Sequence, residues 1–149
     1  MLTVTPFLWF ESQAEEAMLF YTSIFPRGKV GSVKRIGGNV LGVEFELEGQ
    51  KIHALNGRPK ELAFNDSVSF FVGCETQDEI DTLWAKLLGT GGSPVQCGWL
   101  RDRYGLAWQI VPNSLGKLLD GNGDPARATR VMNAMLSMTK LDIAALESA

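Results

Sequence analysis

The sequence contains an internal repeat, and this repeat limits the folds that the chain can adopt. Each half has a quartet that begins with Ser or Thr and ends with Glu, residues 12–15 and 76–79, ahead of an amphipathic segment. Such a quartet is the capping box that starts α-helices. Each half also closes with short alternating segments, and aligning them places His53 opposite Gln109. Because the order of elements agrees as well, we favour duplication over a chance likeness between two α+β halves.

The first half predicts the order strand, helix, strand, strand, strand. A bulky run after Pro6 is suited to an edge strand, and the helix that starts at Ser12 ends at Pro26. The later strands are separated by turns at residues 37–39 and 48–50, where glycine tolerates the backbone of a hairpin. The expected strands are residues 7–10, 30–36, 40–47 and 51–56.

The second half repeats this order and is followed by a helical region. A strand over residues 67–72 precedes a helix capped by Thr76, and a hairpin over residues 97–112 closes the half. The spacing beyond it predicts helices over 126–137, with Pro125 at the start, and 142–147. The expected fold is therefore α+β, with residues 1–149 as one domain. It comprises two tandem β-α-β-β-β modules (3–56 and 67–112), a linker (57–66) and a C-terminal helical extension (113–149).

Composition excludes several classes of function. The 149 residues carry a net charge of −3 and no run of Lys or Arg, so we expect no nucleic-acid partner. No apolar run approaches the roughly 20 residues that a membrane span needs, and no signal-peptide pattern opens the chain. Cys74 and Cys97 lack CxxC spacing, which favours reduced thiols. We therefore expect a cytoplasmic protein that has no membrane partner.

The closing hairpin holds the most informative polar residue. Gln109 is a lone amide among apolar neighbours on its strand, so it points either at a partner in the core or into a cavity. The turn over residues 101–103 is expected to be solvated. Cys97 has no histidine nearby in the sequence, so nucleophilic catalysis is not expected there.

Several segments resemble the PhnB-like family, also labelled the 3-demethylubiquinone-9 3-methyltransferase domain. They are residues 6–10, 14–17, 20–21, 24–26, 97–100 and, most specifically, the Trp-Gln-Ile-Val-Pro ending at 108–112. This family is part of the vicinal oxygen chelate superfamily of glyoxalases, bleomycin-resistance proteins and extradiol dioxygenases. The resemblance runs from Thr5 through the C-terminal helix. It implies two modules whose sheets curl into half-barrels that enclose a cavity.

The resemblance also implies positions for metal ligands, because metal-binding members take one ligand from the first and last strand of each module. These positions are Thr5, His53, Ser69 and Gln109. Only His53 is a good ligand, and the set has no carboxylate. A shift of one strand step, two residues, would place Phe7 or Phe71 at the first-strand positions. We therefore predict no metal and no cofactor, with a divalent metal as the alternative.

The remaining cavity is expected to hold a small, partly planar molecule by hydrogen bonds between aromatic walls. His53 is either a general base or a strand histidine with a structural role, and Gln109 is either a ligand anchor or a satisfied core amide. The predicted ligand-binding residues are Trp9, His53, Asn56, Ser69, Phe71, Trp108 and Gln109, with His53 as the candidate catalytic residue.

Three functions are compatible with this sequence. The first is a metal-free protein that binds or sequesters a small molecule, as in the bleomycin-resistance branch of the superfamily. The second is an enzyme acting on a small oxygenated metabolite, with His53 as base or metal ligand. The third is the methyltransferase of the family label, although no Gly-rich loop follows a strand. The apolar C-terminal helix either packs on the core or covers a second subunit, and we expect a homodimer.

Overall fold

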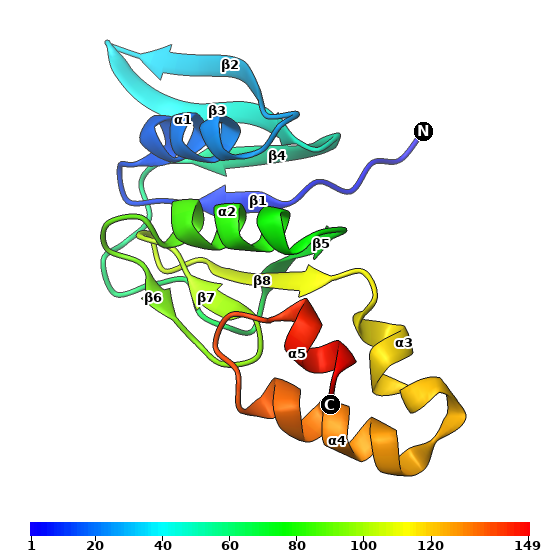
Figure 1. Cartoon of the computed structure of the whole chain (residues 1–149). Helices are drawn as coiled ribbons and strands as arrows, with labels where there is room; N and C mark the ends of the chain where they lie inside the picture. The colour runs from blue at the N-terminus through cyan, green and yellow to red at the C-terminus, as the bar shows by residue number, and fades with distance from the viewer. The chain divides into compact units, whose positions relative to one another are not determined.

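The computed structural model describes all residues, 1–149, and the chain divides into two compact units, Met1–Ala63 and Phe64–Ala149. Each unit contains a four-stranded mixed sheet, with the strand order β1-β4-β3-β2 in the first and β5-β8-β7-β6 in the second (Figure 1). In both sheets the first strand of the unit pairs in parallel with the last. The matching strand orders confirm the two β-α-β-β-β modules predicted from the repeat.

The first unit is built from two tight hairpins and one crossover helix. Its turns at residues 37–38 and 48–49 have positive φ at both positions, the geometry that matches strand twist in two-residue hairpins. Helix α1 provides the crossover that the parallel pairing of β1 with β4 requires. The elements are β1 (Phe7–Trp9), α1 (Ala14–Ile24), β2 (Lys29–Ile36), β3 (Asn39–Leu47) and β4 (Gln50–Leu55).

Helix α1 packs on one face of this sheet and leaves the other face open. Tyr21 of the helix is fully buried and its ring stacks on that of Phe45 in β3, with the ring centroids 6.2 Å apart. Alternation along the strands places the other set of side chains on the open face, including Phe7, Glu44 and His53.

The predicted cap of the first helix is wrong. The helix begins at Ala14, and neither Ser12 nor Gln13 caps it through its side chain. Instead, Asn56 accepts a hydrogen bond from the Ala14 amide at 2.9 Å and donates one to the Val40 carbonyl at 3.1 Å. Asn56 follows β4, so only the folded sheet brings it to the helix N-terminus.

The second unit repeats the arrangement with shorter strands. Thr76 caps its helix as predicted, because its hydroxyl accepts a hydrogen bond from the Glu79 amide at 3.2 Å. Ile80, Trp84 and Leu87 then bury one face of the helix. The elements are β5 (Ser69–Cys74), α2 (Gln77–Leu88), β6 (Ser93–Pro94), β7 (Trp99–Arg101) and β8 (Ala107–Pro112).

The turn between β7 and β8 is not solvated throughout, which corrects the expectation for Asp102. Its side chain is 2% exposed and accepts hydrogen bonds from the amides of Tyr104 and Leu106 at 2.9 and 3.1 Å. Its second oxygen accepts from the indole of Trp108 at 2.9 Å. Arg101 is exposed as expected and pairs with Asp66, which lowers the pKa of that carboxyl.

The C-terminal extension forms helices where the sequence predicted them and belongs to the second unit. Cys97 and Gly98 donate backbone hydrogen bonds to the carbonyls of Met138 and Thr139, each at 2.8 Å. The side chain of Leu141 is fully buried. None of the helices has the length and apolar character needed to span a bilayer. The elements are α3 (Leu115–Leu119), the 3₁₀ turn η1 (Gly121–Gly123), α4 (Pro125–Leu136) and α5 (Ile143–Glu147).

Candidate functional site

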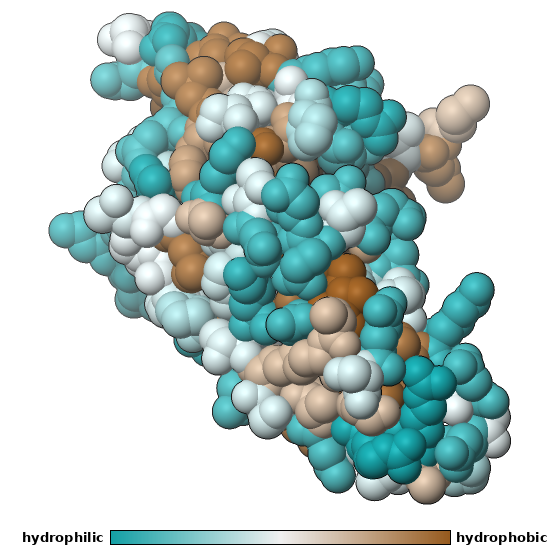
Figure 2. All heavy atoms as spheres, in the orientation of Figure 1, coloured by the Kyte–Doolittle hydropathy of each residue, from teal (hydrophilic) through white to brown (hydrophobic).

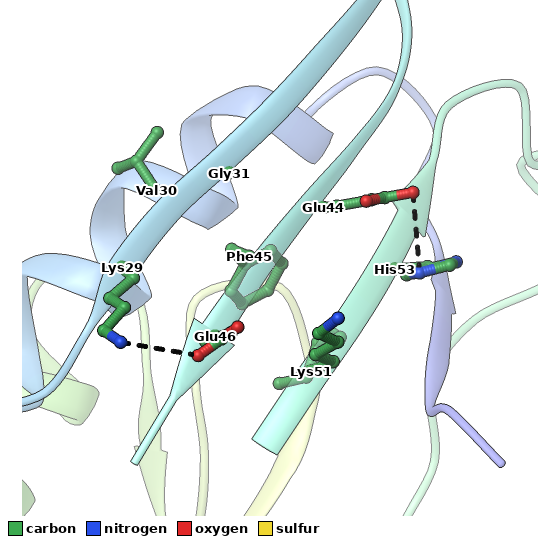
Figure 3. Close-up of a pocket in the computed structure, with 9 residues that line it drawn as sticks. Lys29, Val30, Gly31, Glu44, Phe45, Glu46, Lys51 and His53 are labelled. Atoms are coloured by element: carbon green, nitrogen blue, oxygen red, sulfur yellow. Dashed lines mark ion pairs between the residues drawn. The ribbon is translucent and has the colours of Figure 1, made fainter. Parts of the chain in front are cut away.

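The strand register places one row of side chains across the open face of each sheet. In the first unit, Phe7 of β1 and Glu44 of β3 lie level with His53 of β4 on either side. The His53 Nε2 atom lies 3.6 Å from a carboxylate oxygen of Glu44 (Figure 3). Glu44 was not predicted from the sequence as a site residue. The signal was present, because a two-residue turn at 48–49 pairs residue 44 with residue 53.

The open face of the first unit carries two shallow hollows that contain charged side chains. One, of about 250 Å³, includes Lys29, Glu46 and Lys51 beside His53, and Lys29 lies 3.9 Å from Glu46 (Figure 3). The other, of about 210 Å³, lies between Phe7 and Lys34 and also includes His53. The side chain of His53 is 41% exposed, so its imidazole is accessible to a molecule in solution. This face is suited to a polar or charged partner.

The equivalent row in the second unit has different chemistry. Phe71 of β5 and Trp99 of β7 lie level with Gln109 of β8 on either side, so the amide stands between two aromatic residues. The Gln109 Nε2 atom donates to the Ser69 hydroxyl at 2.9 Å, and the amide oxygen has no hydrogen-bond partner. A hydroxyl both donates and accepts, so Ser69 can bond either the nitrogen or the oxygen of the amide. Whichever of the two it bonds, the other end of the Gln109 side chain has no partner.

Gln109 and both of its aromatic neighbours line a cavity of about 430 Å³. This volume lies within the roughly 300–1,000 Å³ typical of ligand pockets. No charged side chain is among the residues that line it. They are Phe71, Cys97, Trp99, Gln109, Val111, Pro112, Asn113, Leu115, Gly116, Leu119 and Met135.

The other predicted ligand residues lie elsewhere in the fold. Trp108 is 1% exposed and packs edge-on against the Phe70 ring at 5.0 Å between centroids, so it belongs to the core of the second unit. It neighbours Gln109 in sequence and therefore points to the opposite face of β8. Trp9 is 38% exposed on the open face of the first unit. Asn56 uses both ends of its amide at the N-terminus of α1.

The structure therefore brings together Ser69, Phe71 and Gln109, and it adds Trp99 to them. Trp108 is the clear correction to the predicted aromatic wall. Two adjacent strand residues point to opposite faces, so Trp108 and Gln109 do not line one cavity.

The side chains at the positions of metal ligands do not suit a divalent metal. Phe7 lies level with His53 and Phe71 lies level with Gln109, so the first strand of each module supplies no donor at these positions. Thr5 precedes β1, and Ser69 is a poor ligand already bonded to Gln109. No group of three His, Cys, Asp or Glu residues gathers anywhere in the structure.

The comparisons with known proteins identify the family. A family model described as 3-demethylubiquinone-9 3-methyltransferase matches residues 2–111. The chain belongs to this family. A solved structure from Bacillus cereus, titled a putative 3-demethylubiquinone-9 3-methyltransferase and PhnB protein, is 34% identical to it. That match covers 74% of this chain and 99% of the other, with a TM-score of 0.69.

More distant structures show the fold of the family alone. The Pseudomonas aeruginosa protein PA1353 is 18% identical and covers 75% of this chain and 98% of its own, with a TM-score of 0.59. A glyoxalase/bleomycin resistance protein from Albidiferax ferrireducens is 12% identical and covers 74% and 98%, with a TM-score of 0.51. No curated protein matches the chain. The family model ends before the C-terminal extension.

Proposed function

We propose that the chain is a small-molecule binding protein that holds a partly planar ligand at Gln109 without a metal. The observation that supports this function is the position of the Gln109 amide between Phe71 and Trp99, inside a cavity of about 430 Å³. Ligand pockets typically combine apolar walls with a few polar groups that set the orientation of the ligand. The free amide oxygen accepts a hydrogen bond from the ligand, and Ser69 orients the amide.

The geometry of the row also favours a flat ligand. Neighbouring strands lie about 4.8 Å apart, so the strands that carry Phe71 and Trp99 are separated by roughly 10 Å. Aromatic side chains that project from both strands flank a space over Gln109 that suits one flat ring system. Offset or edge-on contacts between rings contribute about 0.5–1.5 kcal/mol beyond the burial of apolar area.

Replacing the amide tests this proposal directly. A fragment collection is screened against the full chain by ligand-observed NMR, and each hit is titrated against Gln109→Leu. We expect hits to lose about tenfold in affinity, because a half-buried hydrogen-bonding partner is replaced by an apolar group of similar size. Gln96→Leu is the matched control, since Gln96 is exposed in the same unit. Equal affinity in both variants would rule out Gln109 as the anchor.

The proposed absence of a metal has its own test. Elemental analysis of the protein after mild purification should find no stoichiometric divalent ion. A stoichiometric ion that is lost in Gln109→Leu or His53→Ala would contradict the proposal.

A second candidate function is an enzyme that uses His53 as a general base. Glu44 favours it, because its carboxylate lies 3.6 Å from the His53 Nε2 atom, where it can orient the imidazole when a substrate binds. If a substrate screen finds turnover, His53→Ala should abolish it, and Glu44→Gln should lower it. Activity that survives His53→Ala would exclude the base.

The methyltransferase of the family label is a third candidate. The glycines at 37–38 form a hairpin turn and those at 89–92 follow helix α2, so neither precedes a helix as a nucleotide-binding loop does. Calorimetric titration with S-adenosylmethionine distinguishes the cases. Binding at micromolar concentration would favour the label over our proposal.

We also propose a homodimer. Apolar side chains remain on the surface of both units, on edge strand β2 and on α4. Val30 and Ile36 are 55% and 62% exposed, and apolar residues gather over β2 at the top of Figure 2. Such surface is commonly covered by a partner. Light scattering should report twice the chain mass of 16.3 kDa, and a monomer would refute the dimer.

A further inference from the structure

The C-terminal extension supplies part of the wall of the Gln109 cavity. Leu115, Gly116 and Leu119 of α3 and Met135 of α4 line it opposite the sheet residues. α3 follows directly from the end of β8, the strand that carries Gln109 (Figure 1). The family model ends at residue 111, so these wall residues are not part of the segment that defines the family.

The extension is held firmly against the second unit. Gln77, at the start of α2, donates to the Leu141 carbonyl at 3.0 Å and accepts from the Ile143 amide at 2.8 Å. Lys140 forms an ion pair with Asp81 at 2.7 Å. These contacts join the segment that follows α4 to helix α2 of the same unit.

The cavity excludes charge. None of its eleven lining residues is Asp, Glu, Lys, Arg or His. The cavity is open to solvent on one side, because Phe71 is 63% exposed and Gln109 is half-buried. An ion there keeps part of its hydration, but no counter-charge replaces the part that it loses. The hollows of the first unit differ, because lysine and glutamate side chains line them.

We propose that the C-terminal extension selects the ligand of the Gln109 site, which is a neutral aromatic molecule with one hydrogen-bond donor. This inference rests on the proposed function. The ring lies between the row of Phe71 and Trp99 and the extension, and the donor meets the free oxygen of Gln109. Met135 and α3 exclude ligands that carry a net charge or a bulky polar group on that side.

A set of naphthalene probes tests the selection. 2-Naphthol and 2-naphthamide are neutral donors, whereas 2-naphthoate is an anion of the same ring size. Each is titrated into the full-length protein at pH 7 by ligand-observed NMR. We expect the neutral probes to bind about tenfold more tightly than the anion, because the anion loses part of its hydration and gains no counter-charge. Equal affinity for the anion would overturn the inference.

Two variants test the role of the extension. Gly116→Leu places a side chain in the cavity, since no atom lies within 4 Å of a Cβ added at Gly116. It also replaces a helical glycine, so stability should be kept or increased. We expect it to reduce binding of 2-naphthol at least about tenfold by filling the site. Met135→Ala should weaken binding about fivefold through lost apolar contact.

Met132→Ala is the matched control for Met135→Ala, because Met132 lies on the same helix but is 40% exposed and does not line the cavity. Equal effects of the two alanine variants, or unchanged binding in Gly116→Leu, would overturn the role of the extension. If Gln109→Leu still reduced binding about tenfold, the proposed function would stand even though the role of the extension was refuted. If no neutral probe bound the unaltered protein, both proposals would fail.

Discussion

Asp102 provides a sharp test of how the second unit is held together. Its carboxylate is 2% exposed and accepts hydrogen bonds from two backbone amides and from the indole of Trp108. Asp102→Ala removes both acceptor oxygens, and with them three hydrogen bonds, and leaves the donors in place. The Leu106 amide and the Trp108 indole are buried, so water does not readily replace the carboxylate.

The expected cost follows from these donors. A buried donor without a partner costs about 1–3 kcal/mol, and two such donors remain after Asp102→Ala. We therefore expect a loss of about 4 kcal/mol in the free energy of unfolding. Asp102→Asn keeps an acceptor for the backbone amides but turns an NH₂ group toward the indole, which should cost about 2 kcal/mol.

Urea unfolding followed by far-UV circular dichroism measures these values without relying on the fluorescence of Trp108. Combining Asp102→Asn with Trp108→Phe removes the clash between two donors, so the double variant should be about 1 kcal/mol more stable than additivity predicts. A loss below about 1 kcal/mol in Asp102→Ala, or strict additivity in the double variant, would refute the reasoning.

Three further outcomes are expected. Asn56→Ala should reduce stability by about 1–2 kcal/mol in urea unfolding, because helix α1 loses its cap, and an unchanged midpoint would contradict this role. Gly98→Ala should cost more than Gly105→Ala. Both have φ near +84°, but only at Gly98 does an added Cβ meet other atoms at 2.8–3.0 Å, and equal costs would refute the clash. Burial, with a contribution from a nearby carboxylate, raises the pKa of the Cys74 thiol to about 11. At pH 8 a disulfide reagent should therefore react with Cys97 alone, and rapid reaction of both thiols would contradict this. The free energy of unfolding should fall between pH 9 and 11, because in this range Cys74 ionises in the unfolded chain but not in the folded one.

The elements of the fold were largely readable from the sequence, because they depend on local chemistry. Thr76 followed by Glu79 predicted the start of α2, and Pro125 predicted the start of α4. The capping box predicted at Ser12 was wrong because a residue from another part of the fold caps the helix. Asn56, some forty residues away, occupies the position that Ser12 was expected to fill.

The candidate site was readable in part. Aligning the repeats placed His53 and Gln109 at equivalent positions, and the strand register agrees, because each lies level with a phenylalanine on the first strand of its module. The expected first-strand positions, Thr5 and Ser69, were two residues too early, since Phe7 and Phe71 lie there instead. The error at Trp108 was avoidable, since alternation already separates it from Gln109. Trp99 was missed as a site residue because nothing in the sequence states which residue of β7 lies level with Gln109.

By itself the sequence determined the duplicated α+β modules, the helix capped by Thr76 and the two residues that mark equivalent positions, because periodicity and turn chemistry act over a few residues. The tertiary structure alone decided that Asp102 is buried, that Asn56 caps a distant helix and that the extension walls the Gln109 cavity. These features depend on contacts between segments far apart in the chain, and no local pattern specifies which distant partner satisfies a polar group or covers an open sheet face.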